Sequence, residues 1–222
     1  MTVPAAEGAP AGADPPRPVS PELRATLRRV RRELEALDVA VYDAVAGTPS
    51  PTMDPALARI SNAANRSRLW LVVAGVLTTL GTKPRRAALI GVAAVGATSA
   101  VVNLAVKPAL TRGRPQRAES SRTRRVRMPT SRSFPSGHTA SAFAFSSAVG
   151  GELPALSTPL RLMATTVAYS RVHAGVHYPG DVIIGALIGA GMGTATRLMA
   201  PRVGARVAAR RSSGTHESLR KS

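Results

Sequence analysis

The 222-residue sequence contains no cysteine, which excludes disulfide bonds, thiolate metal sites and cysteine nucleophiles. It has one Trp, three Tyr and three Phe, too few aromatic residues to favour a surface that stacks on nucleic-acid bases. Acidic residues are also scarce: 12 Asp and Glu accompany 30 Lys and Arg, giving a formal net charge of +18. This excess fits a nucleic-acid binder, a protein bound to anionic lipid, or an enzyme acting on phosphorylated substrates.

The positive charge is concentrated in two segments. Residues 111–137 contain eight Arg and one Glu, and residues 201–222 contain six Lys and Arg against one Glu. Residues 138–169, by contrast, hold one acidic and one basic residue. The basic segments therefore alternate with stretches that carry almost no charge.

The N-terminal part divides into two predicted segments. Residues 1–20 are rich in Ala, Pro and Gly and are predicted to be disordered; they lack the basic start and apolar run of a signal peptide, so none is expected. Residues 21–68 are predicted to be an amphipathic helix, up to residue 46, and a linker, because Leu and Val recur there at spacings of three and four. This helix could pack on its own domain, lie on a membrane surface, or pair with a second subunit.

Five apolar stretches follow, and the second, Ala87–Val106, is 20 uncharged residues long. That length crosses a bilayer core of about 30 Å. The others are shorter, and the soluble helical core is the alternative interpretation. The five stretches are residues 69–81, 87–106, 139–151, 162–169 and 182–196.

The last apolar stretch contains Gly185, Gly189 and Gly193 at four-residue spacing, which suits close contact between membrane helices. We therefore predict an all-α, polytopic membrane helical bundle of about five transmembrane helices over residues 69–200. The N-terminal amphipathic helix precedes it, and residues 201–222 are predicted to be a basic disordered tail. With five spans, the loops around residues 111–137 and 170–181 lie on the same side of the membrane.

Two histidines lie in loop-like segments beside other reactive residue types. In Ser133-Phe-Pro-Ser-Gly-His138 an apolar helix follows directly, and backbone N–H groups at a helix start bind anions. Simple capping by Ser136 is the alternative interpretation. In the second segment, Asp181 follows His177 by four residues and could fix its tautomer, leaving the other ring nitrogen free to attack. Asp181 could instead cap the helix that we expect to begin at Val182.

A third segment, from Lys107 to Pro115, follows the clearest apolar stretch. A Lys at this position could extend to lipid headgroups. The three segments together are more specific than any one of them. Lys107 is separated by six residues from Arg114-Pro115; Pro135-Ser-Gly-His138 follows; then Ser170-Arg171, five residues, His177, three residues and Asp181. This order and spacing resemble the signature of the type 2 phosphatidic acid phosphatase superfamily, which includes vanadium haloperoxidases and bacterial acid phosphatases.

The resemblance covers about residues 69–200 and implies a role for each matching residue. It implies that His177 is the nucleophile that forms a phosphohistidine, that Asp181 orients it, and that His138 is the general acid and then the general base. It also implies that no metal or cofactor is needed. The phosphate-binding residues that it implies are Lys107, Arg114, Ser136, Gly137 and Arg171.

The short apolar chain is unlike the large soluble haloperoxidases and the secreted acid phosphatases. We therefore expect a multi-pass enzyme of the cell membrane that removes phosphate from a lipid phosphate. The candidate substrates are phosphatidate, phosphatidylglycerol phosphate, polyprenyl pyrophosphates and a polyprenyl-phosphosugar phosphate. The alternative is a non-enzymatic basic membrane protein, or a nucleic-acid binder using the loop arginines, which would leave the histidines and Asp181 unexplained; we expect no nucleic-acid partner. The sequence leaves the oligomeric state open. The loop arginines are Arg122, Arg124, Arg125, Arg127 and Arg132.

Overall fold

The structure is a computed structural model that describes residues 20–110, 112–116, 126 and 128–220, with side chains up to residue 201. The predicted disordered segment lies outside these residues except for Ser20, and so do all the loop arginines except Arg132. The chain forms two compact units, Met1–Leu37 and Asp38–Ser222, and each is described by itself.

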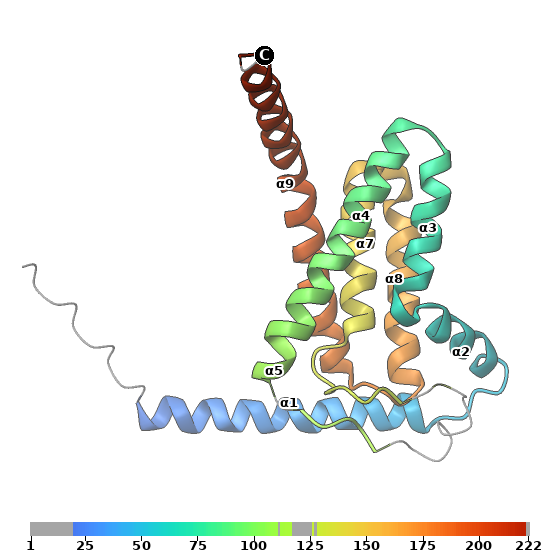
Figure 1. The fold of residues 1–222 in the computed structure, drawn as a ribbon. Coiled ribbons are helices and arrows are strands. Elements are labelled where there is room, and N and C mark those ends of the chain that lie inside the picture. Colours follow the sequence, from blue (N-terminus) through green and yellow to red (C-terminus); the bar gives the residue numbers. More distant parts are fainter. Residues whose placement is uncertain (1–19, 111, 117–125, 127, 221–222) are drawn as a thin grey trace, which may run out of the picture. The chain divides into compact units, whose positions relative to one another are not determined.

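Every regular element in the described part of the chain is a helix (Figure 1). The all-α prediction is therefore confirmed for these residues. The helices are α1 (Pro21–Gly47), α2 (Asp54–Ala63), η1 (Asn65–Ser67), α3 (Arg68–Thr79), α4 (Thr82–Ala100), η2 (Val101–Val106), α5 (Lys107–Ala109), α7 (Gly137–Glu152), η3 (Pro154–Leu156), α8 (Ser157–His173) and α9 (Pro179–Arg220).

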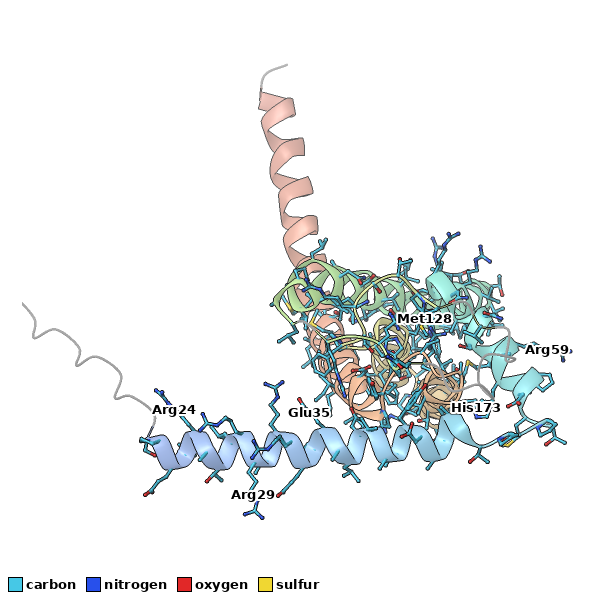
Figure 2. The ribbon with its side chains drawn as sticks, turned by 90° about the horizontal axis from the view of Figure 1, so that it is seen from below. Arg24, Arg29, Glu35, Arg59, Met128 and His173 are labelled. Carbon is cyan, nitrogen blue, oxygen red and sulfur yellow. The ribbon has the colours of Figure 1, made fainter. Side chains whose placement is uncertain are left out.

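Helix α1 has the extent that the apolar spacing predicts. The Ser20 hydroxyl accepts a hydrogen bond from the Leu23 backbone N–H at 3.2 Å, which satisfies one of the free donors of the first turn. Arg24 and Arg29 project from different sides of the helix (Figure 2). The exposed apolar side chains of the first unit are Leu23, Leu27, Val30, Leu34 and Leu37.

Helix α7 is the centre of the second unit and contacts α4, α8 and α9 (Figure 1). Because it carries no charge before its last residue and is rich in Ala and Ser, it can be buried on all sides. Phe145 of α7 packs against Trp70 of α3, with ring centroids 5.3 Å apart. Both side chains are buried in the main apolar core.

Helices α7 and α9 approach closely along the glycine ridge that the sequence predicts. A Cβ at Gly185 would lie 2.7 Å from the backbone oxygen of Ser136, and a Cβ at Gly189 would overlap the backbone oxygen of Ala140. Gly193 meets Ala144 in the same way. Only glycine permits this separation between the two backbones.

Four of the five predicted apolar stretches lie entirely within helices, namely α4 with η2, α7, α8 and α9; the first, residues 69–81, extends two residues beyond the end of α3 at Thr79. Two helical segments in the described part of the chain are long and apolar enough to cross a membrane, Thr82–Ala109 and Pro179–Pro201. The count of about five transmembrane helices stays a prediction. Helix α2 lies in the region assigned to a linker, and α9 continues to Arg220 across the region assigned to the basic tail.

We predict that Gly189→Ala destabilises the fold by about 1–3 kcal/mol, because the new methyl group would overlap the backbone of α7. Gly191→Ala is the matched control, since nothing lies within 4 Å of its Cβ position. Unfolding of the detergent-solubilised protein can be followed by the fluorescence of Trp70, the single tryptophan, which is 1% exposed. Equal unfolding midpoints for the two variants would contradict the close packing of α7 on α9.

Candidate active site

His177 lies in the loop between α8 and α9, and its side chain is buried. Its Nδ1 lies 3.3 Å from Oδ2 of Asp181, so the carboxylate favours the tautomer with the proton on Nδ1. Its Nε2 faces Nη1 of Arg114 at 3.3 Å. One ring nitrogen of His177 is therefore held by a carboxylate, while the other faces a cation.

Asp181 is the third residue of α9, because the helix begins at Pro179, three residues earlier than predicted. A proline in the first turn costs no hydrogen bond, since those N–H groups have no partner within the helix. Oδ2 of Asp181 accepts a hydrogen bond from the Tyr178 backbone N–H at 3.0 Å and another from the Ser133 hydroxyl. Asp181 is therefore not the residue before a helix that begins at Val182, as the alternative interpretation supposes; from within the first turn of α9 it accepts from the backbone N–H of Tyr178 and contacts His177.

Arg112 connects Asp181 to Asp38, which lies in the second half of α1. Its Nη1 donates to Oδ1 of Asp181 at 3.0 Å, and its Nη2 donates to Oδ2 of Asp38 at 2.5 Å. Oδ1 of Asp38 also accepts a hydrogen bond from the Gly180 backbone N–H at 2.6 Å. The guanidinium group of Arg112 lies 4.3 Å from the ring centroid of Tyr178. Asp38 therefore links α1 to the first turn of α9 in two ways, through the backbone N–H of Gly180 and, by way of Arg112, through the side chain of Asp181.

Lys107 follows a wider turn at the end of α4. In η2 the Lys107 backbone N–H bonds the oxygen of Val102, five residues earlier, a π-helical pattern that is often found at functional sites. Its Nζ donates to Oγ of Ser131 at 3.2 Å. A Cβ at Gly137 would lie 3.7 Å from the same Nζ, so Lys107 lies close to the start of α7.

Arg114 is fixed on the other side of Ser131. Its Nε donates to the Ser131 backbone oxygen at 2.8 Å, and its Nη1 donates to the Val176 backbone oxygen at 2.6 Å. Arg132 bonds the backbone oxygens of Lys107 and Pro108 and so closes the end of α5. Residues 131–133 therefore hold both cations and, through Ser133, the carboxylate that orients His177.

Helix α7 begins at Gly137, next to the amino group of Lys107. The Ser136 side chain makes no capping hydrogen bond to the backbone, because its Oγ accepts from the Thr139 hydroxyl at 3.0 Å. The Ser136 backbone N–H donates to the backbone oxygen of Asp181 at 2.9 Å. The Nε2 of His138 lies 2.8 Å from Oδ1 of Asn65 in η1.

Arg171 and His173, near the end of α8, are held from α2. Nη1 of Arg171 donates to Oγ of Ser61 at 2.5 Å, and Nε2 of His173 lies 2.6 Å from Oδ1 of Asp54. Both side chains are buried. His173 packs against Tyr169, with ring centroids 5.7 Å apart, which suits a structural role.

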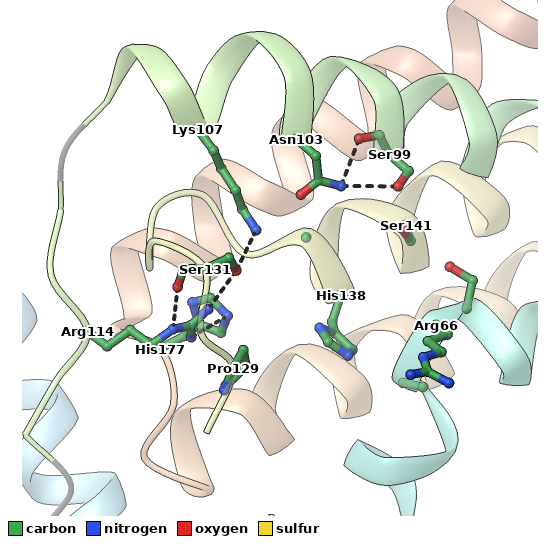
Figure 3. Close-up of a pocket in the computed structure, with 13 residues that line it drawn as sticks. Arg66, Ser99, Asn103, Lys107, Arg114, Pro129, Ser131, His138, Ser141 and His177 are labelled. Carbon is green, nitrogen blue, oxygen red and sulfur yellow. Dashed lines mark hydrogen bonds between the residues drawn. The ribbon is translucent and has the colours of Figure 1, made fainter. Parts of the chain in front are cut away.

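These elements enclose a cavity of about 180 Å³ (Figure 3). Its walls carry three cationic side chains and two imidazoles, and none of the described residues that line it is acidic. The cavity therefore suits an anion. The lining residues with ionisable side chains are Arg66, Lys107, Arg114, His138 and His177.

The environment of each histidine shifts the pKa of its imidazole. The pKa of His177 is lowered to about 4: burial is the largest cause, and Arg114 and Arg171 lower it too, although the hydrogen bond to Asp181 raises it. Burial also lowers the pKa of His138, and the charges of Arg171 and of the neighbouring His177 add to this effect. A phosphate group between them would act in the opposite direction, because its negative charge favours the protonated imidazole.

Most of the residues predicted for the site converge on this cavity. The predicted residues that line it are Lys107, Arg114, Gly137, His138 and His177. Asp181 does not line it but contacts His177. Two predicted phosphate ligands are not among its lining residues: the Ser136 hydroxyl is turned toward Thr139, and Arg171 is bonded to Ser61.

Other residues of the site belong to no sequence motif that would predict them. Ser131 and Asn65 are the nearest polar partners of Lys107 and His138, and Asp38 and Arg112 support Asp181. Of these residues, only Arg112 lies inside a segment that the sequence predicts for the site, the one from Lys107 to Pro115. The described side chains form no cluster of three or more His, Asp or Glu that could hold a metal ion.

Residues 87–205 of the chain match the PAP2 superfamily. The decaprenylphosphoryl-5-phosphoribose phosphatases of two Mycobacterium tuberculosis strains, CDC 1551 / Oshkosh and ATCC 25618 / H37Rv, are each 40% identical to it over 72 residues. That match covers 31% of this chain and 37% of each relative, so the chain spans little more than a third of their length.

Two crystal structures share the fold. Aquifex aeolicus LpxE is 25% identical, with a TM-score of 0.58 over 72% of this chain and 94% of that one. The PAP2 type phosphatidylglycerolphosphate phosphatase from Bacillus subtilis is 21% identical, with a TM-score of 0.59 over 77% of this chain and 88% of that one. The family match covers more than half of the residues and includes every residue of the signature, so the chain belongs to the PAP2 superfamily.

Proposed function

We propose that this chain is a multi-pass membrane phosphatase that removes phosphate from a lipid phosphate through a phosphohistidine formed on His177. The observation that carries this proposal is the pairing at His177: Nδ1 lies 3.3 Å from the Asp181 carboxylate, while Nε2 lies beside Arg114 at the cation-lined cavity. Family membership and the phosphatase names of the relatives support the same reaction type.

In the first step, Nε2 of His177 attacks phosphorus, an N–P bond forms and the bond from phosphorus to the lipid oxygen breaks. His138 gives its proton to the leaving oxygen, so the lipid departs as an alcohol. Negative charge on the phosphoryl oxygens is stabilised by Lys107, Arg114 and the backbone N–H groups at the start of α7. Asp181 stabilises the positive charge that develops on the His177 ring.

In the second step, His138 takes a proton from water, and the resulting hydroxide-like oxygen attacks phosphorus. The N–P bond breaks, its electron pair returns to Nε2 of His177, and inorganic phosphate leaves. His138 is then protonated and His177 is neutral, as at the start. The cycle consumes one water molecule and needs no other reactant.

A polyprenyl-phosphosugar phosphate is the substrate class to test first. The relatives with 40% identity are named for decaprenylphosphoryl-5-phosphoribose, and the apolar stretches beside the site suit a substrate whose tail stays in the bilayer. Phosphatidylglycerol phosphate, which is in the name of one structural neighbour, is the comparison substrate.

We also propose that α3, α7 and α8 complete a bundle of about five spans with the two long apolar helices.

We predict that the detergent-solubilised protein releases inorganic phosphate from these lipids in EDTA and that His177→Asn lowers the rate by more than about 10³-fold, because the nucleophile is lost. Brief incubation with a ³²P-labelled substrate should label wild type with an acid-labile, base-stable phosphate that is absent from the variant. Trp70 fluorescence checks the fold of both proteins. Equal phosphate release by wild type and variant would overturn the assignment of the nucleophile.

We predict that the acid limb of kcat/KM lies near pH 4 rather than 6.5, since His177 attacks only when neutral and its pKa is lowered to about 4. Protonation below that pH removes the attacking electron pair, so activity falls with falling pH. The limb is measured with two substrates whose phosphates differ in their second pKa, and it should not move between them. An acid limb at pH 6.5 for both would contradict the depressed pKa.

We predict that Asp38→Asn lowers kcat about tenfold with little change in KM. Without the Asp38 charge, Arg112 is drawn more strongly to Asp181, and the carboxylate turns away from His177. Asp43→Asn, an exposed position on the same helix, is the control. The loss should be smaller when Arg112 is already Gln, because the two residues act through one contact. Identical kinetics for the variants at positions 38 and 43 would exclude this positioning role.

A further inference from the structure

The segment before α3 holds three residues of the candidate site. Asp54 bonds His173, Ser61 bonds Arg171, and Asn65 bonds His138 at 2.8 Å. This segment, α2 with η1, lies outside residues 87–205, which match the family. The contacts of these residues with the site are therefore not explained by the signature.

The amide group of Asn65 is itself oriented. Its Nδ2 donates to Oδ1 of Asn62, 3.4 Å away, so its carbonyl oxygen is the atom that faces His138. A carbonyl oxygen can only accept a hydrogen bond, so Nε2 of His138 carries the donated proton. The other ring nitrogen, Nδ1, is then the one available for proton exchange, and His138 lines the cavity.

The backbone after Asn65 adopts an uncommon conformation. Arg66 and Ser67 have φ values of 52° and 59°, in the left-handed region that residues other than glycine rarely adopt. Such residues cost about 1–3 kcal/mol each and are concentrated at functional sites. Both line the same cavity as His138. The left-handed pair turns the chain from α2 into α3 directly after Asn65, whose amide reaches His138 in the first turn of α7.

We propose that Asn65 is the positioning residue for His138: it accepts the Nε2 proton and so directs Nδ1 toward the leaving oxygen and then toward water. The proposal rests on the proposed function, in which His138 is the acid and base. The two histidines are then supported differently, His177 by a carboxylate and His138 by a neutral amide.

The neutral partner suits the acid role. The charged or titratable groups around His138 are Arg171 on α8, His177 in the next loop, Lys107 and Arg114, and Arg66 lines the same cavity. A carboxylate in place of Asn65 would hold the imidazolium proton against transfer to the leaving group. An amide fixes the ring without opposing that transfer, so the charge of the bound phosphate controls when His138 is protonated.

The test compares substrates with poor and good leaving groups, because only a poor leaving group needs the acid. For an alkyl lipid phosphate, Asn65→Ala should lower kcat/KM by about 10- to 100-fold, part of the 10²–10⁴ that general acid catalysis supplies. For 4-nitrophenyl phosphate the loss should stay below about threefold. Arg59→Gln is the control, since Arg59 is exposed on α2 and points away from the bundle (Figure 2). Equal losses with both substrates would indicate a merely structural role and overturn the proposal.

A second variant distinguishes a lost hydrogen-bond acceptor from misfolding as the cause of a lower rate. Asn65→Asp keeps an acceptor for Nε2, so for the lipid phosphate it should recover part of the kcat that Asn65→Ala loses, although the carboxylate holds the proton of His138 more tightly. Its charge raises the pKa of His138, so the basic limb of kcat/KM should move to higher pH. An unshifted limb would overturn the proposal.

The result is separable from the proposed function. If wild type is inactive, or if His138→Ala shows no selective loss with the poor leaving group, the proposed function fails. If His138→Ala shows that loss and Asn65→Ala behaves like Arg59→Gln, only the role of Asn65 fails.

Discussion

The buried carboxylate of Asp181 is the group on which the rest of the site depends. It accepts from Ser133 and from the Tyr178 backbone, lies against His177 and pairs with Arg112. A buried charge is tolerated only when partners replace the lost water, so each contact that stabilises Asp181 also fixes a piece of chain next to it. This one side chain therefore helps to position the first turn of α9, the loop at Ser133 and the part of α1 around Asp38.

The cations and the helix start have a complementary role. Lys107 and Arg114 are held by Ser131 and by backbone oxygens, rather than by the carboxylates of the site. Their charges are thus available to an incoming anion, whereas Arg112 is already neutralised by Asp38 and Asp181. This division separates two neighbouring arginines of one short segment: Arg114, which we propose binds the phosphate, and Arg112, which pairs with the Asp181 carboxylate.

Much of this arrangement could be predicted from the sequence, and the rest could not for physical reasons. Asp181 follows His177 by only four residues, so contact between them could be predicted, and the uncharged runs identify the helices around α7. Asn65, Ser61 and Asp38 were missed because they reach the site through tertiary packing across 73 to 142 residues, which leaves no local pattern. The direction of the Ser136 hydroxyl was equally hidden, since capping and internal bonding to Thr139 use the same residues. Helix ends were off by a few residues because Pro179 begins α9 instead of preceding it.

The glycine ridge has a consequence for the number of residues between Asp181 and Gly185. Gly185 packs α9 against the Ser136 carbonyl, one turn after Asp181, so the same packing sets the distance from the Asp181 carboxylate to the start of α7. One residue inserted between Asp181 and Gly185 would leave the ridge in contact but rotate the carboxylate about 100° around the helix axis. A substitution in this turn changes one side chain and leaves the carboxylate in place. An insertion or deletion would leave the fold stable but turn the carboxylate away from His177.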